Sequence, residues 1–236
     1  MSFKFKQFSV EQDCCAMKIG TDGVLLGSWS PIPEEVFSVL DIGTGTGIIA
    51  LMIAQRTNTG QIDALEIDEE AYEQATENFE NSPWSDRLFY FHAGLDELID
   101  DPEDEYDLII SNPPFYTENY KTDNTQRDLA RFEDAMPFEM LIEATDLLLS
   151  ENGIFSVIIP FKEEINFLAL AKEFELFPMK ITRVKGTPTS EIKRSLLAFK
   201  RFETKEIEID ELTIETERHI YTAEYIALTK DFYLKM

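Results

Sequence analysis

A chain of 236 residues, of which 44% are hydrophobic, can bury one large core, which excludes a disordered protein and favours one domain over residues 1–236. No apolar run approaches the roughly 18 residues of a membrane span, and the N-terminus lacks a signal-peptide pattern, so we expect a soluble, cytoplasmic protein. A monomer is the expected oligomeric state. The only cysteines, Cys14 and Cys15, are adjacent, which disfavours a disulfide or a metal site, and the net charge of −25 disfavours nucleic acid unless basic residues cluster locally.

Short apolar runs alternate with amphipathic segments, which is typical of βαβ units around a mostly parallel sheet. The apolar runs predict strands over Val36–Ile42, Gln61–Ile67, Leu88–His92, Tyr106–Ser111 and Ile154–Ile159. The amphipathic segments predict helices over Ile48–Arg56, Glu69–Glu80, Phe138–Leu149 and Lys162–Glu173. We expect Gly153 to end the third helix in a left-handed cap. The long polar stretch Tyr116–Pro137 is predicted to be a functional or mobile loop.

The last part of the chain departs from this alternation. Two β-like runs, Phe177–Val184 and Ser195–Phe202, follow each other without a helix between them, which predicts an antiparallel hairpin at the edge of the sheet. Residues 203–236 are predicted to form a tail that ends in a helix. The expected organisation is an extension over residues 1–30, an α/β core over 31–202 with helices on both faces of the sheet, and this tail.

The strongest local motif lies where the first predicted strand meets the first predicted helix. Asp41 is followed by glycines at alternate positions, Gly43, Gly45 and Gly47. Glycines let the backbone approach a ligand because no Cβ intervenes. The turn from strand to helix is also the place where open α/β sheets bind ligands, so the motif predicts a cofactor site.

The spacing of this motif discriminates between cofactors. A dinucleotide fingerprint requires glycine at its sixth place, which is Ile48 here. The Asp41 carboxylate disfavours a pyrophosphate and suits a cationic ligand with an amino-acid end. Glu66, at the end of the second strand, is placed to accept hydrogen bonds from both hydroxyls of a ribose.

A second motif follows the strand Tyr106–Ser111, at the same edge of the predicted sheet. Its residues are Asn112, Pro113, Pro114 and Phe115. The prolines stiffen the backbone and supply carbonyl acceptors without N–H donors, Asn112 adds a side-chain carbonyl oxygen, and Phe115 offers a flat face. The set suits a planar substrate with an NH₂ group, because two acceptors can hold both hydrogens and keep the nitrogen lone pair available.

Positive charge is concentrated in one stretch of this acidic chain. Residues 180–201 contain seven basic residues and one acid, whereas residues 61–110 contain 17 acids and one basic residue. We expect nucleic-acid phosphates to bind the following basic residues: Lys180, Arg183, Lys185, Lys193 and Arg194, extended by Lys121, Arg127 and Arg131 of the polar loop. The alternative is a solvated basic face without a partner.

With both motifs placed, the sequence resembles class I S-adenosylmethionine methyltransferases of the amino-methylating Asn-Pro-Pro-[Phe/Tyr] group. More narrowly, it resembles the bacterial tRNA (adenine-N6) methyltransferases that modify the adenosine 3′ of the anticodon of a valine tRNA. The narrower likeness rests on Gly20–Gly23 near the start and Phe232–Lys235 near the end. It implies N6 methylation as the reaction, tRNA as the partner and S-adenosyl-L-methionine as the cofactor.

The resemblance also implies a structure. The fold would be α/β and Rossmann-like, with a seven-stranded, mostly parallel sheet whose last strand is antiparallel. Residues 1–30 would cover the cofactor, with Thr21 or Asp22 at its methionine end, and Asp96 would hold its adenine amino group. Instead of contacting the cofactor, Thr21 or Asp22 could equally cap the start of a helix.

Other functions use the same motifs. A protein methylase acting on a glutamine amide needs the same acceptors, but the sequence offers no separate recognition domain and its basic stretch favours RNA. An rRNA guanine-N2 methylase shares the Asn-Pro-Pro-Phe motif. A nucleotide-binding module without activity would not need Asn112 to Phe115.

Overall fold

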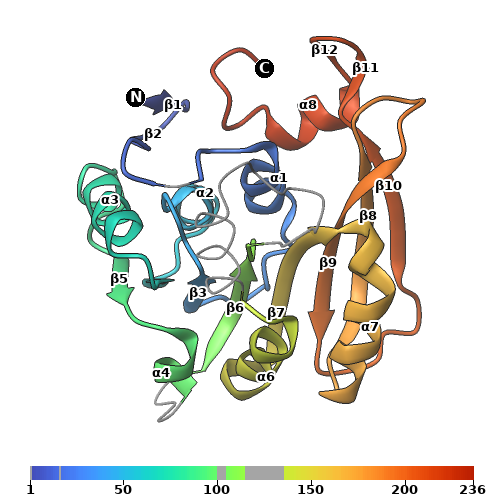
Figure 1. Ribbon diagram of the computed structural model, residues 1–236, viewed down its shortest axis with the longest axis horizontal. Helices are drawn as coiled ribbons and strands as arrows, with labels where there is room; N and C mark the ends of the chain where they lie inside the picture. The colour runs from blue at the N-terminus through green and yellow to red at the C-terminus, as the bar shows by residue number, and fades with distance from the viewer. Residues whose placement is uncertain (1, 16, 100–104, 115–135) are drawn as a thin grey trace, which may run out of the picture.

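The computed structural model describes residues 2–15, 17–99, 105–114 and 136–236. Within them, an eight-stranded sheet in the order β10-β8-β9-β7-β6-β3-β4-β5 is flanked by helices (Figure 1). Its strands are β3 (Ser38–Ile42), β4 (Gln61–Glu66), β5 (Leu88–His92), β6 (Tyr106–Ser111), β7 (Leu149–Pro160), β8 (Phe177–Lys185), β9 (Ile192–Lys200) and β10 (Glu208–Thr213). Only β9 runs antiparallel to its neighbours, so the other seven strands end at one edge, here called the carboxyl edge.

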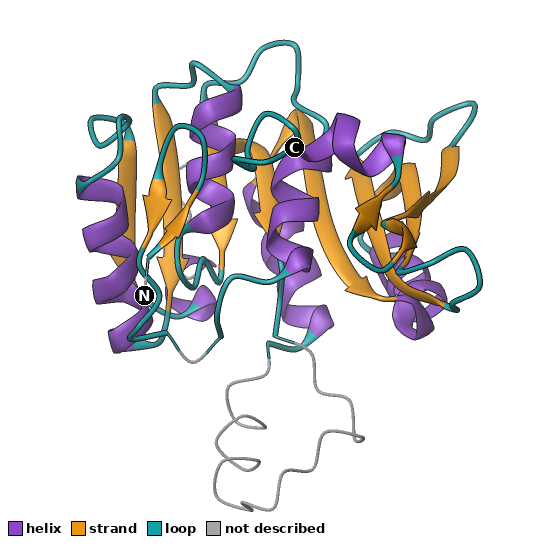
Figure 2. Ribbon diagram, turned by 90° about the horizontal axis from the view of Figure 1, so that it is seen from above, coloured by secondary structure: helices purple, strands orange, loops and turns teal. Residues whose placement is uncertain are grey.

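Helices lie on both faces of this sheet, and Figure 2 shows its strands side by side across the width of the molecule. The helices are α1 (Thr21–Trp29), α2 (Ile48–Arg56), α3 (Glu69–Glu80), α4 (Leu95–Ile99), α6 (Phe138–Leu148), α7 (Glu164–Glu173) and α8 (Ala223–Thr229), with a 3₁₀ turn η1 (Phe161–Glu163). Two short strand pairs complete the described part, β1 (Phe3–Lys4) with β2 (Ser9–Val10), and β11 (Glu215–Glu217) with β12 (Ile220–Tyr221). None of the described helices is long and apolar enough to cross a membrane.

A separate hydrophobic core covers each face of the sheet. On β6, Leu108 and Ile110 belong to the core that includes α1, α2 and α8, whereas Ile109 belongs to the core under α4, α6 and α7. This alternation follows from the strand geometry, in which successive side chains point to opposite faces. Burial on both faces explains why the central strands are continuous apolar runs.

The α/β fold class with helices on both faces is confirmed, and four predicted elements, α2, α3, β5 and β6, have the predicted bounds. The prediction that Gly153 forms a left-handed helix cap is wrong. Helix α6 passes into β7 at Leu149, and Gly153 lies inside that strand, without the positive φ that a left-handed cap requires. A Cβ on Gly153 would lie 2.7 Å from Leu149 Cδ1 and 3.0 Å from the Tyr106 carbonyl oxygen, so close packing explains this glycine.

The hairpin of β8 and β9 is antiparallel as predicted, but its predicted place at the sheet edge is wrong. Residues 208–213, expected in the tail, form β10, which pairs in parallel with β8 from Glu208↔Lys180 to Thr213↔Lys185. The sheet therefore has eight strands and not seven. The sequence of β10 is acidic and mostly exposed, so it lacks the apolar alternation from which a strand is recognised.

The two ends of the chain lie together. Phe5 forms an isolated antiparallel bridge with Tyr233, and their rings stack with centroids 5.8 Å apart. The backbone N–H of Lys6 donates to the Phe232 carbonyl at 2.8 Å. This contact anchors the first residues before the chain continues toward the carboxyl edge.

Candidate active site

The glycine motif forms the turn between β3 and α2. The φ angles of Gly43, Gly45 and Gly47 are +69°, +57° and +79°. An L side chain rarely adopts these values, because its Cβ would meet the neighbouring carbonyl oxygen. The local backbone therefore requires glycine at all three positions.

The three glycines nevertheless differ in what surrounds them. A Cβ built on Gly43 or Gly45 would meet nothing within 4 Å, so open space borders the turn there. A Cβ on Gly47 would lie 2.4 Å from Cε1 of Phe79, a fully buried residue of α3. Gly43 and Gly45 leave room for a ligand against the backbone, whereas Gly47 allows α2 and α3 to pack closely.

Asp41 holds this turn from inside the protein. Its side chain is 1% exposed, and Oδ2 accepts hydrogen bonds from the Thr44 hydroxyl at 2.7 Å and the Ala50 N–H at 3.1 Å. Its other oxygen, Oδ1, accepts no hydrogen bond from a described residue. Burial raises the pKa of the Asp41 carboxyl to about 7. A positive charge beside the turn would stabilise the ionised carboxylate.

Glu66 ends β4 directly beside the turn. Its Oε2 accepts the Gly45 N–H at 2.8 Å, and its Oε1 accepts the N–H groups of Ile67 and Asp68 at 3.0 Å each. A carboxylate offers about four acceptor positions, so these three bonds orient the group and leave capacity for a hydroxyl. The open space at the turn, the buried carboxylate and this acceptor fit a cationic nucleoside cofactor such as S-adenosylmethionine.

The other predicted cofactor residues are more peripheral. Asp96 lies in α4, just beyond the end of β5, and its side chain is exposed at the carboxyl edge. Thr21 is the exposed first residue of α1. The capping role considered for Thr21 and Asp22 is wrong, because Gly20 is the N-cap and no side chain caps the helix. Asp22 instead forms an ion pair with Arg194, with 2.8 Å between Oδ2 and Nε.

Two buried polar residues of α3 hold the N-terminal segment against the glycine turn, and neither was predicted from the sequence. The Asn78 amide donates to the Thr46 and Glu11 carbonyl oxygens at 2.9 Å each and accepts the Glu11 N–H at 2.8 Å. Gln74 Oε1 accepts the Asp13 N–H at 3.1 Å. Gln74 and Asn78 are four residues apart, so both lie on the buried face of an amphipathic helix, where apolar residues are expected. Two polar residues at such positions could have indicated a structural role.

The Asn-Pro-Pro motif follows β6 at the carboxyl edge. Ser111, the last residue of β6, is paired in register with Ile42, which directly precedes Gly43, so the motif and the glycine turn leave adjacent strands. Asn112 is half-buried, and its side-chain amide has no hydrogen-bond partner among the described residues. Pro113 is buried and Pro114 half-buried, whereas Phe115 lies outside the described residues.

The basic stretch contains more ion pairs than isolated charges. Five of its seven cations contact a carboxylate from elsewhere in the fold, as follows: Lys180 with Glu208, Arg183 with Glu164, Lys185 with Glu211, Arg194 with Asp22 and Arg201 with Asp146. Lys193 is exposed, and its amine has no ion-pair partner in the part of the chain that the structure describes. These acids, distant in sequence, offset most of the local positive charge.

The register also divides these residues between the two edges of the sheet. Arg194 pairs with Pro160, the last residue of β7, and Lys185 pairs with Ile192, so Lys185, Lys193 and Arg194 lie toward the carboxyl edge with Asn112. Lys180 pairs with Ala198, toward the opposite edge. The loop cations Lys121, Arg127 and Arg131 lie outside the described residues. Among the described residues, no group of three or more His, Cys, Asp or Glu side chains is arranged to hold a metal ion.

The parallel sheet with one antiparallel strand, the glycine turn beside Glu66 and the adjacent Asn-Pro-Pro turn define a class I S-adenosylmethionine-dependent methyltransferase. A solved structure from Agrobacterium tumefaciens, described as a predicted O-methyltransferase, shares this fold with a TM-score of 0.69 and 18% identity, over 89% of this chain and 96% of that one. The model of the methyltransferase small domain matches residues 25–175.

Relatives match the chain over almost its whole length, among them the following two. A protein of Flavobacterium johnsoniae named tRNA1(Val) (adenine(37)-N6)-methyltransferase is 76% identical over 234 residues, which cover 99% of this chain and 100% of the relative. A protein of Flavobacterium psychrophilum with the same name is 74% identical with the same coverage. The chain belongs to this family of methyltransferases.

Proposed function

We propose that this protein transfers a methyl group from S-adenosylmethionine to N6 of adenosine 37 in a valine tRNA. The observation that carries the proposal is the identity of 76%, over its full length, with a relative named for this reaction. The geometry supports it, because the turn with open space for the cofactor and the Asn112 amide lie at the ends of adjacent strands. A cytoplasmic location follows from a tRNA substrate.

The chain's own residues supply positioning and acceptors. When bound, S-adenosylmethionine supplies an electrophilic methyl group on a positively charged sulfur. The Asn112 side-chain oxygen and the Pro113 carbonyl would accept the two hydrogens of the adenine amino group, which keeps the nitrogen lone pair out of the ring system. No strong base is required, because the methylated amine loses its extra proton readily to water. Phe115 is proposed to stack on the extruded base.

The experiment that tests the function uses labelled S-adenosylmethionine and total RNA from cells that lack the gene. After incubation with the purified protein, the RNA is separated and the labelled nucleosides are analysed. We expect the label in a valine tRNA as N6-methyladenosine. Label in rRNA, as methylguanosine or in protein would contradict the proposal and support one of the alternative substrates.

A further inference from the structure

An exposed aromatic ring and an arginine lie side by side at the carboxyl edge. Phe161 directly follows Pro160, the last residue of β7, and is 37% exposed. The guanidinium carbon of Arg183, on β8, lies 5.7 Å from the centroid of the Phe161 ring. We call these two side chains the Phe161–Arg183 surface. Ile165, four residues later on α7, is 79% exposed.

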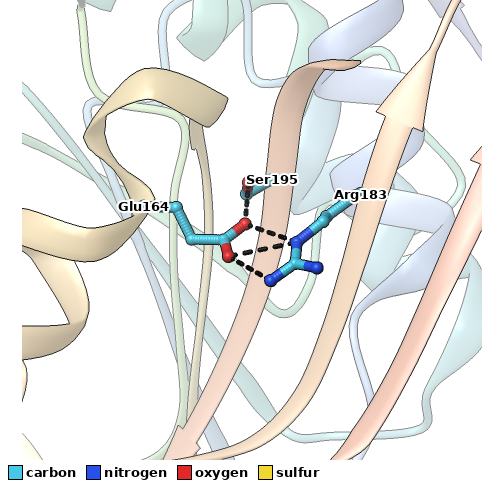
Figure 3. A network of polar contacts seen from close by, with 3 residues as sticks. All are labelled: Glu164, Arg183 and Ser195. Atoms are coloured by element: carbon cyan, nitrogen blue, oxygen red, sulfur yellow. Dashed lines mark hydrogen bonds and ion pairs between the residues drawn. The ribbon is translucent and has the colours of Figure 1, made fainter. Parts of the chain in front are cut away.

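A buried carboxylate holds Arg183 in this position. Glu164 is 3% exposed and accepts hydrogen bonds from Arg183 Nε at 3.1 Å and Nη2 at 2.7 Å. The Ser195 hydroxyl donates to the same carboxylate at 2.5 Å, so the network joins α7, β8 and β9 (Figure 3). The hydrogen bonds to Glu164 also raise the pKa of the Arg183 guanidinium, which therefore stays charged.

One part of the guanidinium is left for a partner. Nη1 of Arg183 points away from the carboxylate in Figure 3 and donates to no described residue. The Arg183 side chain is 34% exposed. Anchoring α7 to the sheet requires Glu164, Arg183 and Ser195, but it does not require an exposed ring beside them. The ring and the available N–H donors indicate a binding surface.

The register places this surface beside the transfer site. Ser111 pairs with Val157 across β6 and β7, so Asn112 lies level with Ile158, and Phe161 follows three residues later at the end of the neighbouring strand. At about 3.3 Å per residue, Phe161 lies roughly 10 Å beyond Asn112 along the strand direction. A nucleotide joined to the one held at Asn112 can therefore reach it.

We infer that the Phe161–Arg183 surface binds the unpaired nucleotide next to the methylated adenosine, with the base stacked on Phe161 and the phosphate bound by Arg183 Nη1. The inference rests on the proposed function. Extruding the target base removes a stacking partner from its neighbour, and an aromatic ring can replace that partner whatever the base is. Arginine provides paired donors for phosphate oxygens, which fits the charge of the backbone.

The test measures methylation of an anticodon stem-loop RNA by three variants. Phe161→Ala should raise the KM for RNA about tenfold while kcat and the affinity for S-adenosylmethionine stay near wild type. Phe161→Tyr should restore the wild-type KM, because a ring is again present. Phe202→Ala is the matched control, since Phe202 is 56% exposed but follows β9 at the opposite edge.

A second RNA separates stacking from a general loss of structure. When the neighbouring nucleotide lacks its base, the KM of the wild type should rise and Phe161→Ala should add nothing further. The inference would be overturned if Phe161→Ala raised the KM by the same factor for both RNAs, or if it left the KM for the intact RNA unchanged. If Phe161→Ala does not fold, Phe161→Leu decides by the same comparison. Failure of the wild type to methylate the intact stem-loop would overturn the proposed function and this inference with it.

Discussion

The Ser111 hydroxyl donates a hydrogen bond to the Ile42 carbonyl oxygen at 2.9 Å. Ser111 is fully buried, and the two residues immediately precede Asn112 and Gly43. This bond therefore joins the strand that carries the proposed transfer site to the strand that carries the proposed cofactor turn. It adds to the backbone pairing of β3 with β6, which holds the two turns next to each other.

Ser111→Ala should lower the transfer rate more than its effect on stability explains. Loss of one buried hydrogen bond costs about 1 kcal/mol of unfolding free energy, and looser spacing between the turns should slow transfer roughly tenfold, since positioning supplies much of the rate. Ser156→Ala is the matched control, because Ser156 is equally buried on β7 but its hydroxyl has no partner among the described residues. Denaturant unfolding and kcat are measured for both. Equal kcat values in the two variants would contradict a positioning role.

Glu66→Ala should weaken binding of S-adenosylmethionine about ten- to a hundredfold. The substitution removes a charged acceptor for a ribose hydroxyl, which is worth roughly 1.5–3 kcal/mol. It also releases the Gly45 N–H that Glu66 holds in the turn. Calorimetry measures the affinity, with Glu70→Ala as the control because Glu70 is an exposed acid at the start of α3. Unchanged affinity in Glu66→Ala would place the cofactor elsewhere.

Asn112→Ala should abolish most of the transfer while leaving cofactor binding near wild type. The variant removes the side-chain oxygen that is proposed to hold the adenine amino group, and loss of one such preorganised group costs about 10²–10³ in rate. Single-turnover methylation measures transfer, and calorimetry measures binding. Near-normal turnover would contradict the mechanism, and a parallel loss of cofactor affinity would assign Asn112 to the cofactor site.

In the absence of cofactor, Asp41→Asn should be more stable than wild type, and the difference in unfolding free energy should be larger at pH 8 than at pH 5. Burial raises the pKa of Asp41 from 3.8 to about 7, so the folded state binds more protons than the unfolded state between these values. The contribution of this group is fully present below pH 4 and is lost as the pH rises through 7. Asparagine does not titrate, so its advantage should grow by about 2–3 kcal/mol between pH 5 and pH 8.

Unfolding by denaturant at both pH values measures this difference. Asp86→Asn, which changes an exposed aspartate, controls for the loss of one negative charge. Asp41→Asn should also bind S-adenosylmethionine more weakly than wild type, because the carboxylate beside the turn is gone. An advantage that does not vary with pH would show that Asp41 is ionised in the folded protein throughout this range.

Lys193→Ala should weaken tRNA binding and reduce the slope of log affinity against log salt by about one unit. Lys193 is exposed toward the carboxyl edge and has no described ion-pair partner, so its charge is available to a phosphate. Lys180→Ala is the control, because Lys180 lies toward the opposite edge and contacts Glu208 at 2.8 Å. The triple change of Lys185, Lys193 and Arg194 to alanine should reduce the slope further. An unchanged slope in the triple variant would place the RNA on another surface.

Local patterns made most of the fold and both motifs predictable. Helices α2 and α3 and strands β5 and β6 have the predicted bounds. Helix α2 begins after Gly47, α3 is amphipathic and begins after Asp68, and β6 ends before Asn112 and Pro113, so local signals set these bounds. The same reasoning failed for β10 and for Gly153. β10 is a strand because β8 offers it an unpaired edge, and Gly153 is a glycine because Leu149 and the Tyr106 carbonyl crowd it.

The sequence by itself determined the class of fold, the glycine turn and the Asn-Pro-Pro turn, because a turn depends on the φ angles and donors of a few consecutive residues. The tertiary structure decided which charged side chains are free of ion pairs and can bind a partner. Arg194 meets Asp22 across 172 positions of sequence, Arg183 meets a buried Glu164, and Asn78 reaches back to Glu11. Electrostatic interactions depend on distance in space and on burial, and neither follows from a local count of charges. The stretch with the highest positive charge in the sequence is therefore largely paired in the folded protein.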